Sequence, residues 1–202
     1  MSFKVRIKQH LNENRLQYTL VILVFLLGFI MGNYQVPGLD GGVKSHLSGI
    51  IDSYLRAGLE GGLYGADILR TAFLRQLQAV LLIWFLGLTV IGLPLVLVFI
   101  WLRGFSLGFT ISFLLHDRAT AGILISLVSV LPQNIIYIPF FFAWSVVALN
   151  FSVYILKGRN SSLPLGRALI AYTSLMIIYL LIFLTGAFVE AYFSPWLLSL
   201  II

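Results

Sequence analysis

The chain has 202 residues, of which 60% are hydrophobic and only 10% charged, and its mean hydropathy is +1.01. This composition excludes an ordinary soluble domain and predicts an all-α integral membrane protein, in which each helix of about 20 apolar residues satisfies its own backbone. The net charge of +6 comes from Lys and Arg residues scattered over short segments, which argues against nucleic acid as a partner. Without cysteine, disulfides, thiolate catalysis and Cys-ligated metals are excluded.

The N-terminal segment sets the expected orientation. Residues 1–17 hold four basic residues and one acidic residue, so the positive-inside rule places this end in the cytoplasm. The first span is predicted at about residues 18–36 and is expected to stay uncleaved, because no small-x-small cleavage pattern follows it. Within it, Gly28 and Gly32 form a GxxxG pair that favours close approach of another helix.

A polar segment follows at about residues 37–75, with four basic and four acidic residues. Apolar side chains recur at helical spacing from Val43 onwards, which predicts an amphipathic extracytoplasmic helix starting near Asp40. A second helix from about Asp67 is expected to run straight into the next span.

The second span is predicted at about residues 77–102, with a kink or tilt where Gly87, Gly92 and Pro94 interrupt it. Arg103 then marks the expected cytoplasmic exit. Gly104 and Gly108 form a second GxxxG pair, suited to helix packing within the chain or between copies in a homo-oligomer.

The path after Arg103 has two solutions. One is a tilted span over about residues 104–131 with His116, Asp117 and Arg118 facing the bundle interior, and the other is a short crossing followed by an interfacial or re-entrant helix. For these three polar residues, a short loop at the interface is favoured over an ion pathway. In both solutions, residues 135–156 bring the chain back to the cytoplasmic side.

The last two spans are predicted at about residues 135–156 and 168–189. The second of them delivers Glu190 to the outside, and residues 193–202 are expected on the outer interface. The prediction is therefore about five transmembrane helices in a single polytopic domain, with the N-terminus inside and the C-terminus outside. The assigned inner segments hold eight basic residues against four or five outside.

The most informative polar cluster is Pro132, Gln133 and Asn134, with Pro139 close behind. A kink stabilised by interhelical hydrogen bonds is favoured over the substrate path of a transporter. The reason is that only one helix break in the sequence is accompanied by several polar side chains. The three histidines lie on different elements and form no metal-binding motif. No catalytic, cofactor or metal site is expected, and the chain is not expected to be an enzyme.

The run from Leu131 to Phe140, which includes Tyr137, and the Lys157-Gly158-Arg159 that follows the next apolar stretch resemble the stage II sporulation protein M family. The order of the other features agrees over nearly the whole chain: a basic start, the first glycine pair, a polar external segment, and the second glycine pair after Arg103.

The resemblance implies a non-enzymatic membrane scaffold that acts in engulfment during endospore formation. Members of the family hold two peptidoglycan hydrolases, sporulation proteins D and P, on the mother-cell side of the septum. On this reading, residues 43–75 and the end after Glu190 provide the docking face. The chief alternative is a small transporter or channel subunit, and a third is a generic subunit of a membrane complex. The residues expected to make helix-packing or partner contacts are Gly28, Gly32, Arg103, Gly104, Gly108, Pro132, Gln133, Asn134, Tyr137 and Glu190.

Overall fold

The structure is a computed structural model that describes residues 9–59, 65–156 and 164–200. The regular structure of these residues is helical, with two short π-helices, η1 and η2, inserted in longer helices. The elements are α2 (Arg15–Gln35), α3 (Gly41–Leu59), α4 (Gly65–Gly87), α5 (Gly92–Ile125), η1 (Ser126–Val130), α6 (Leu131–Leu156), α7 (Leu165–Phe188), η2 (Val189–Phe193) and α8 (Ser194–Ser199).

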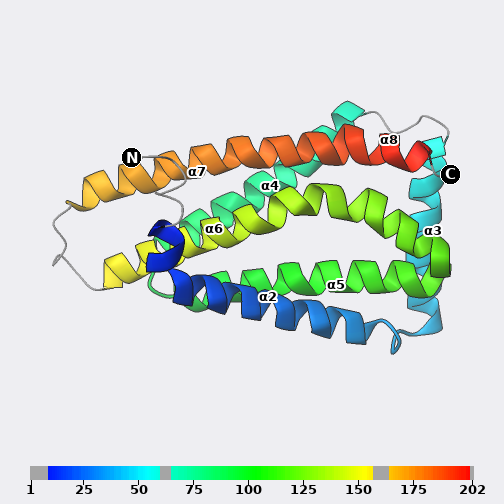
Figure 1. Cartoon of the computed structure of the whole chain (residues 1–202), viewed down its shortest axis with the longest axis horizontal. Coiled ribbons are helices and arrows are strands. Elements are labelled where there is room, and N and C mark those ends of the chain that lie inside the picture. Colours follow the sequence, from blue (N-terminus) through cyan, green and yellow to red (C-terminus); the bar gives the residue numbers. More distant parts are fainter. Residues whose placement is uncertain (1–8, 60–64, 157–163, 201–202) are drawn as a thin grey trace.

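Four helical stretches of the described chain are long and apolar enough to cross a membrane. One of them, Gly92–Leu156, doubles back at Ala119, whose φ of 48° and ψ of −121° are not helical. As a result α5 and α6 run side by side in opposite directions (Figure 1). The predicted all-helical membrane fold is confirmed, while the orientation of the two termini stays a prediction.

Two tight turns move the span boundaries away from those predicted. The predicted second span, about 77–102, is wrong, because α4 ends at Gly87, the chain turns at residues 88–91 and α5 starts at Gly92. A Cβ atom on Gly92 would lie 1.6 Å from the Leu86 carbonyl oxygen, so only glycine allows this reversal. The chain therefore turns where a kink was expected.

The predicted span over about 104–131 is also wrong, as is the alternative of a short crossing with a re-entrant helix. The helix α5 continues from Gly92 to the reversal at Ala119, and His116 to Arg118 lie at that end. A Cβ atom on Gly122 would lie 1.9 Å from the Leu114 carbonyl oxygen, so this second hairpin also depends on a glycine.

The turn between α4 and α5 leaves carbonyl groups without partners in the α4 helix, and side chains of other helices satisfy them. The Tyr172 hydroxyl on α7 donates to the carbonyl of Trp84 (3.2 Å), and the Ser152 hydroxyl on α6 donates to those of Gly87 (3.1 Å) and Thr89 (2.7 Å). In an apolar surrounding each unpaired carbonyl would cost several kcal/mol. These bonds fix α4 to α6 and α7.

The core is centred on Trp144 of α6, which is completely buried. Its indole nitrogen donates to the Val80 carbonyl of α4 (3.2 Å), and its ring stacks on Tyr172 of α7 at 5.2 Å between centroids. Other fully buried side chains in this cluster are Val21, Ile83, Val96, Ile100, Val146, Ala148 and Phe183.

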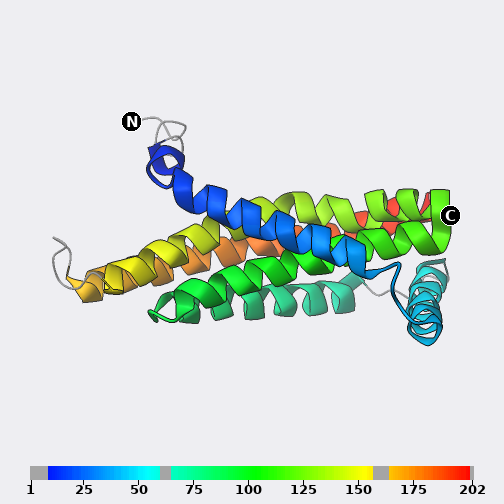
Figure 2. The same ribbon diagram turned by 90° about the horizontal axis from the view of Figure 1, so that it is seen from below.

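The two glycine pairs lie against each other where α2 crosses α5 (Figure 2). A Cβ atom on Gly28 would lie 2.1 Å from the Trp101 carbonyl oxygen of α5, and one on Gly104 would lie 2.1 Å from the Phe25 carbonyl oxygen of α2. Gly32 and Gly108 repeat this contact one turn further along, also at 2.1 Å from carbonyl oxygens. The backbones of the two helices are therefore in direct contact.

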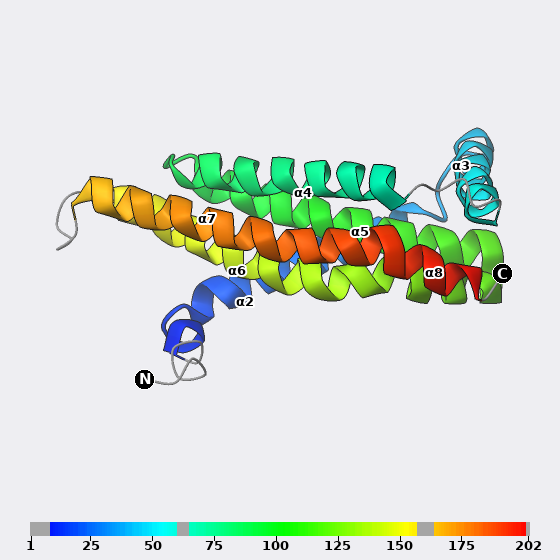
Figure 3. The same cartoon turned by 90° about the horizontal axis from the view of Figure 1, so that it is seen from above.

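The helix α3 lies across the end of the bundle, nearly at right angles to the other helices (Figures 1 and 3). It is the amphipathic helix expected to start near Asp40. Its Asp52 forms an ion pair with Arg118, and its Ser48 donates a hydrogen bond to Asp117. At the opposite end, α6 and α7 extend past α2 and α4 (Figures 1 and 3).

The polar segment between α2 and α4 is shorter than predicted. It was expected to reach about residue 75, but α4 already begins at Gly65, so Arg70 and Arg75 belong to a long apolar helix. The helix that was predicted to start at about Asp67 and to run straight into the next span is therefore confirmed, and only the end of the polar segment was placed too late.

Replacing Gly104 by Leu is expected to force α2 away from α5, because the new side chain would meet backbone rather than a movable side chain. The cost should be at least about 1–3 kcal/mol, seen as a lower melting temperature of the purified chain in detergent. Gly166→Leu is the control, since nothing lies within 4 Å of a Cβ atom there. Equal melting temperatures for the two variants would contradict the close crossing.

Candidate functional site

Arg103 was predicted at a membrane exit, but it lies inside the helix bundle. It stands 11 residues after the start of α5 at Gly92, which is about 17 Å along the helix. A hydrocarbon layer of about 30 Å that began at Gly92 would place Arg103 near its middle. The prediction failed because it placed the end of a span where the structure has the interior of α5.

The guanidinium group of Arg103 is held by one hydrogen bond and two aromatic rings. It donates to Gln76 Oε1 of α4 at 3.2 Å. Its central carbon lies 4.6 Å from the ring centroid of Phe141 and 5.5 Å from that of Phe99. Cation–π contacts of this kind partly replace hydration when a cation is buried. Arg103 therefore links α4, α5 and α6.

Glu190 was predicted outside the membrane, but η2 places it within the bundle. The Tyr137 hydroxyl of α6 donates to Glu190 Oε2 at 2.9 Å, and the positive charge of Arg103 is close enough to interact with the Glu190 carboxylate. Gly186 makes room for the Tyr137 ring, since a Cβ atom there would lie 2.3 Å from it. An ionisable group at this position in a membrane protein is a functional candidate.

The Pro132, Gln133 and Asn134 cluster lies where η1 passes into α6. The amide groups of Gln133 and Asn134 donate to the carbonyls of Ser129 and Val130, and the Ser194 hydroxyl of α8 donates to Gln133 Oε1 at 3.0 Å. Proline cannot donate a backbone hydrogen bond, and irregular helix next to it needs such side-chain partners. The cluster thus stabilises the π-helix and ties α6 to α8.

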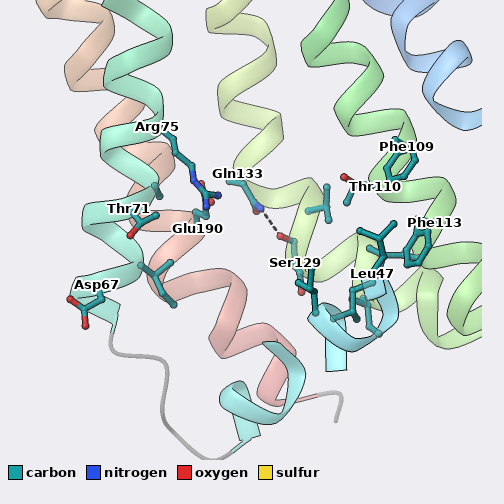
Figure 4. A pocket seen from close by; sticks show the side chains of 17 residues that line it. Leu47, Asp67, Thr71, Arg75, Phe109, Thr110, Phe113, Ser129, Gln133 and Glu190 are labelled. Carbon is teal, nitrogen blue, oxygen red and sulfur yellow. Dashed lines mark hydrogen bonds between the residues drawn. The ribbon is translucent and has the colours of Figure 1, made fainter. Parts of the chain in front are cut away.

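A cavity of about 720 Å³ opens beside this group of polar residues (Figure 4). Helices α4 and α5 form its two sides, with η1, α6 and η2 between them and α3 at one end. A second cavity of about 160 Å³ reaches Arg103 and shares Thr110 and Val130 with the first. The polar residues that line the larger cavity are Asp67, Thr71, Arg75, Thr110, Ser129, Gln133 and Glu190.

The structure brings some of the expected contact residues together and separates others. The two cavities are surrounded by Arg103, Gln133, Tyr137 and Glu190. Pro132 and Asn134 are next to Gln133 in the chain. The four glycines of the two GxxxG pairs instead pack α2 against α5.

Arg75, Gln76, Ser129 and Ser194 were not identified from the sequence. The sequence did contain an indication that Gln76 pairs with Arg103, because these two residues are almost equally far from the turn at residues 88–91. Two antiparallel helices joined there must bring these residues to the same level.

Metal binding finds no support in the described part of the chain. No three His, Asp or Glu side chains gather there in a way that could hold an ion. His46 lies on α3 and His116 at the end of α5, while His10 precedes α2.

Replacing Arg103 by Ala is expected to destabilise the protein by about 2 kcal/mol or more, because Gln76 and Glu190 lose a buried cationic partner. Arg56→Ala, on the exposed side of α3, should change stability by less than about 0.5 kcal/mol. Thermal unfolding in detergent, followed by tryptophan fluorescence, measures both. Arg103→Met combined with Gln76→Leu should recover part of the loss, and a loss as small as that of Arg56→Ala would refute the role of Arg103.

The fold and this buried polar group define a polytopic helical membrane protein whose ionisable side chains lie inside the bundle. The family model described as Stage II sporulation protein M matches residues 21–195, and the chain belongs to that family. It is therefore a sporulation-related membrane protein, and the resemblance seen in the sequence is confirmed. No curated protein and no solved structure matches the chain.

Proposed function

We propose that this protein is a non-enzymatic membrane scaffold for engulfment, which holds the peptidoglycan hydrolases known as sporulation proteins D and P on the mother-cell side of the septum. Membership of the family supports the process in which it acts. The partners, the septal location and the absence of catalysis are part of the proposal.

The observation that carries the proposal is the fixed position of α3. Its Ile51 packs toward the apolar cluster at the bundle end, and Asp52 pairs with Arg118. The other side of the helix remains uncovered, with Val43 at 45% and Ile50 at 54% exposure. A helix already held in place loses little further freedom when a partner binds, which favours association.

The proposed docking face is narrower than the sequence suggested. Residues 65–75 belong to the long apolar helix α4, and Glu190 contacts Tyr137 within the bundle, so we restrict the docking face to α3. We define the docking face as the side of α3 that carries Val43, His46, Ile50 and Ser53. The positive-inside rule favours an extracytoplasmic position for α3, because α2 and α7 carry Arg15 and Arg167 at the other end of the bundle.

The docking face is tested by the double variant Val43→Glu with Ile50→Glu. We expect it to lose most of its capture of protein P from sporulating-cell membranes, because two charges would be desolvated in an apolar contact. Ser45→Glu is the matched control, since it adds a charge to a different side of α3. Capture of protein P that equals that of the control would reject the docking face.

A second variant tests whether the position of α3 matters. Asp52→Asn with Arg118→Gln removes the ion pair but leaves the docking face intact. Exposed pairs contribute about 0.2–1 kcal/mol, so capture of protein P should weaken only a few-fold and protease should cut α3 faster. Unchanged cleavage and capture would show that the ion pair does not hold α3.

A transporter or channel subunit remains the second candidate, and the buried charges of Arg103 and Glu190 favour it. Flux through liposomes that contain the purified chain alone would separate the two functions. Robust flux that Gln133→Leu and Asn134→Leu abolish would favour transport over a scaffold.

A further inference from the structure

The larger cavity has the dimensions and lining of a small-molecule site. Its volume of about 720 Å³ falls in the range of sites that hold ligands of drug size. Most of its walls are apolar, and a few polar side chains converge at one place, which is the usual composition of such sites. The docking face proposed above shares Ile50 with the lining of this cavity but does not use its polar group.

The polar side chains in the cavity have hydrogen-bonding capacity to spare. In the described part of the chain, Arg75 has no ion-pair or hydrogen-bond partner, and Glu190 uses only Oε2, with Tyr137. The Ser129 hydroxyl oxygen is buried without a partner. Figure 4 shows Arg75 extending from α4 toward Glu190 and Gln133. A cation, an anion and a free hydroxyl thus face the same space.

Both π-helices contribute to this group. Ser129 lies in η1 and Glu190 lies in η2. Single π-helical turns inside α-helices occur frequently at functional sites, because they shift side chains out of the regular register. Two such turns that line one cavity are a second indication of a binding site.

The arrangement does not suit a phospholipid. Arg75, Gln133 and Glu190 lie together on one side of the cavity, while Leu47 of α3 and Asp67 near the start of α4 lie away from them (Figure 4). A phospholipid places its headgroup at the membrane surface and its chains toward the middle. Here the group that holds both a cation and an anion lies away from α3, so the cavity fits a small ligand whose charged part enters first.

We propose that the cavity binds a small zwitterion with an apolar side group, such as a short peptide with free termini. Arg75 binds its carboxylate, Glu190 binds its ammonium group, and the Ser129 hydroxyl adds a hydrogen bond. The apolar side groups contact the walls formed by Ile68 and Phe109. Both charges are matched, so neither enters the bundle unpaired.

The test uses the purified full-length chain in detergent and three probes: leucyl-leucine, its N-acetyl form and its C-terminal amide. Binding is measured by calorimetry. We expect leucyl-leucine to bind, and each blocked form to bind at least about tenfold more weakly because one charged contact is lost. Arg75→Gln should remove the discrimination against the amide, and Glu190→Gln the discrimination against the acetylated form.

Two further variants guard against misfolding as an explanation. Thr110→Trp fills the cavity without changing a charge and should abolish binding while the melting temperature stays close to that of the native chain. Arg56→Gln removes a charge from the exposed side of α3 and should bind like the native chain. Failure of all three probes to bind, discrimination that survives in both charge variants, or specific binding of phosphatidylethanolamine in place of leucyl-leucine would overturn the proposal. Capture of protein P is not involved, so the result is independent of the scaffold function.

Discussion

Polar groups of this chain must find partners within the protein, because hydrocarbon offers none, and this requirement organises the bundle. The Trp144 indole and the Ser152 and Tyr172 hydroxyls donate to carbonyls in or next to α4. At the other end, Gln133 and Asn134 do the same for the π-helix that precedes α6. Each bond joins elements that are distant in the chain or supports an irregular segment. The same side chains therefore provide hydrogen-bond partners for backbone carbonyls and hold the helices together.

The same requirement explains the buried charged group. Arg103 is tolerated because Gln76 and two phenylalanine rings surround it, and Glu190 because Tyr137 donates to it. Arg75 differs, since it extends into a cavity without a protein partner in the described chain. This contrast between a satisfied arginine and an unsatisfied one separates the structural part of the polar group from the part available to a ligand.

The sequence predicted the helical class and the amphipathic nature of α3, and it singled out the glycines and amides that the structure places at helix contacts. Periodicity and composition carry this information locally. The sequence did not reveal the reversal at residues 88–91, because an apolar run that bends and one that turns back have the same hydropathy. Gly87 and Gly92 were read as the site of a kink, whereas the short loop favoured at His116 to Arg118 agrees with the reversal at Ala119.

The errors in boundaries also explain the errors in the site. Once the turn between α4 and α5 was missed, Arg103 was assigned to the cytoplasmic exit of a span and Gln76 had no partner. Arg75 was assigned to the outer polar segment and Glu190 to the outer end of the last span, although both line one cavity. Side chains that meet only through a helical hairpin cannot be paired from a single sequence until that hairpin is located.

The unequal lengths of the helices have a consequence for the surrounding bilayer. The helices η1 and α6 together run from Ser126 to Leu156, about 45 Å at 1.5 Å per residue, and carry exposed Leu127, Ile135 and Leu156 along that length. A hydrocarbon layer of about 30 Å must thicken around such a pair of helices, or the helices must tilt, at a cost of a fraction of a kcal/mol per Å. Lipid elasticity itself would then draw together proteins that deform the layer in the same way.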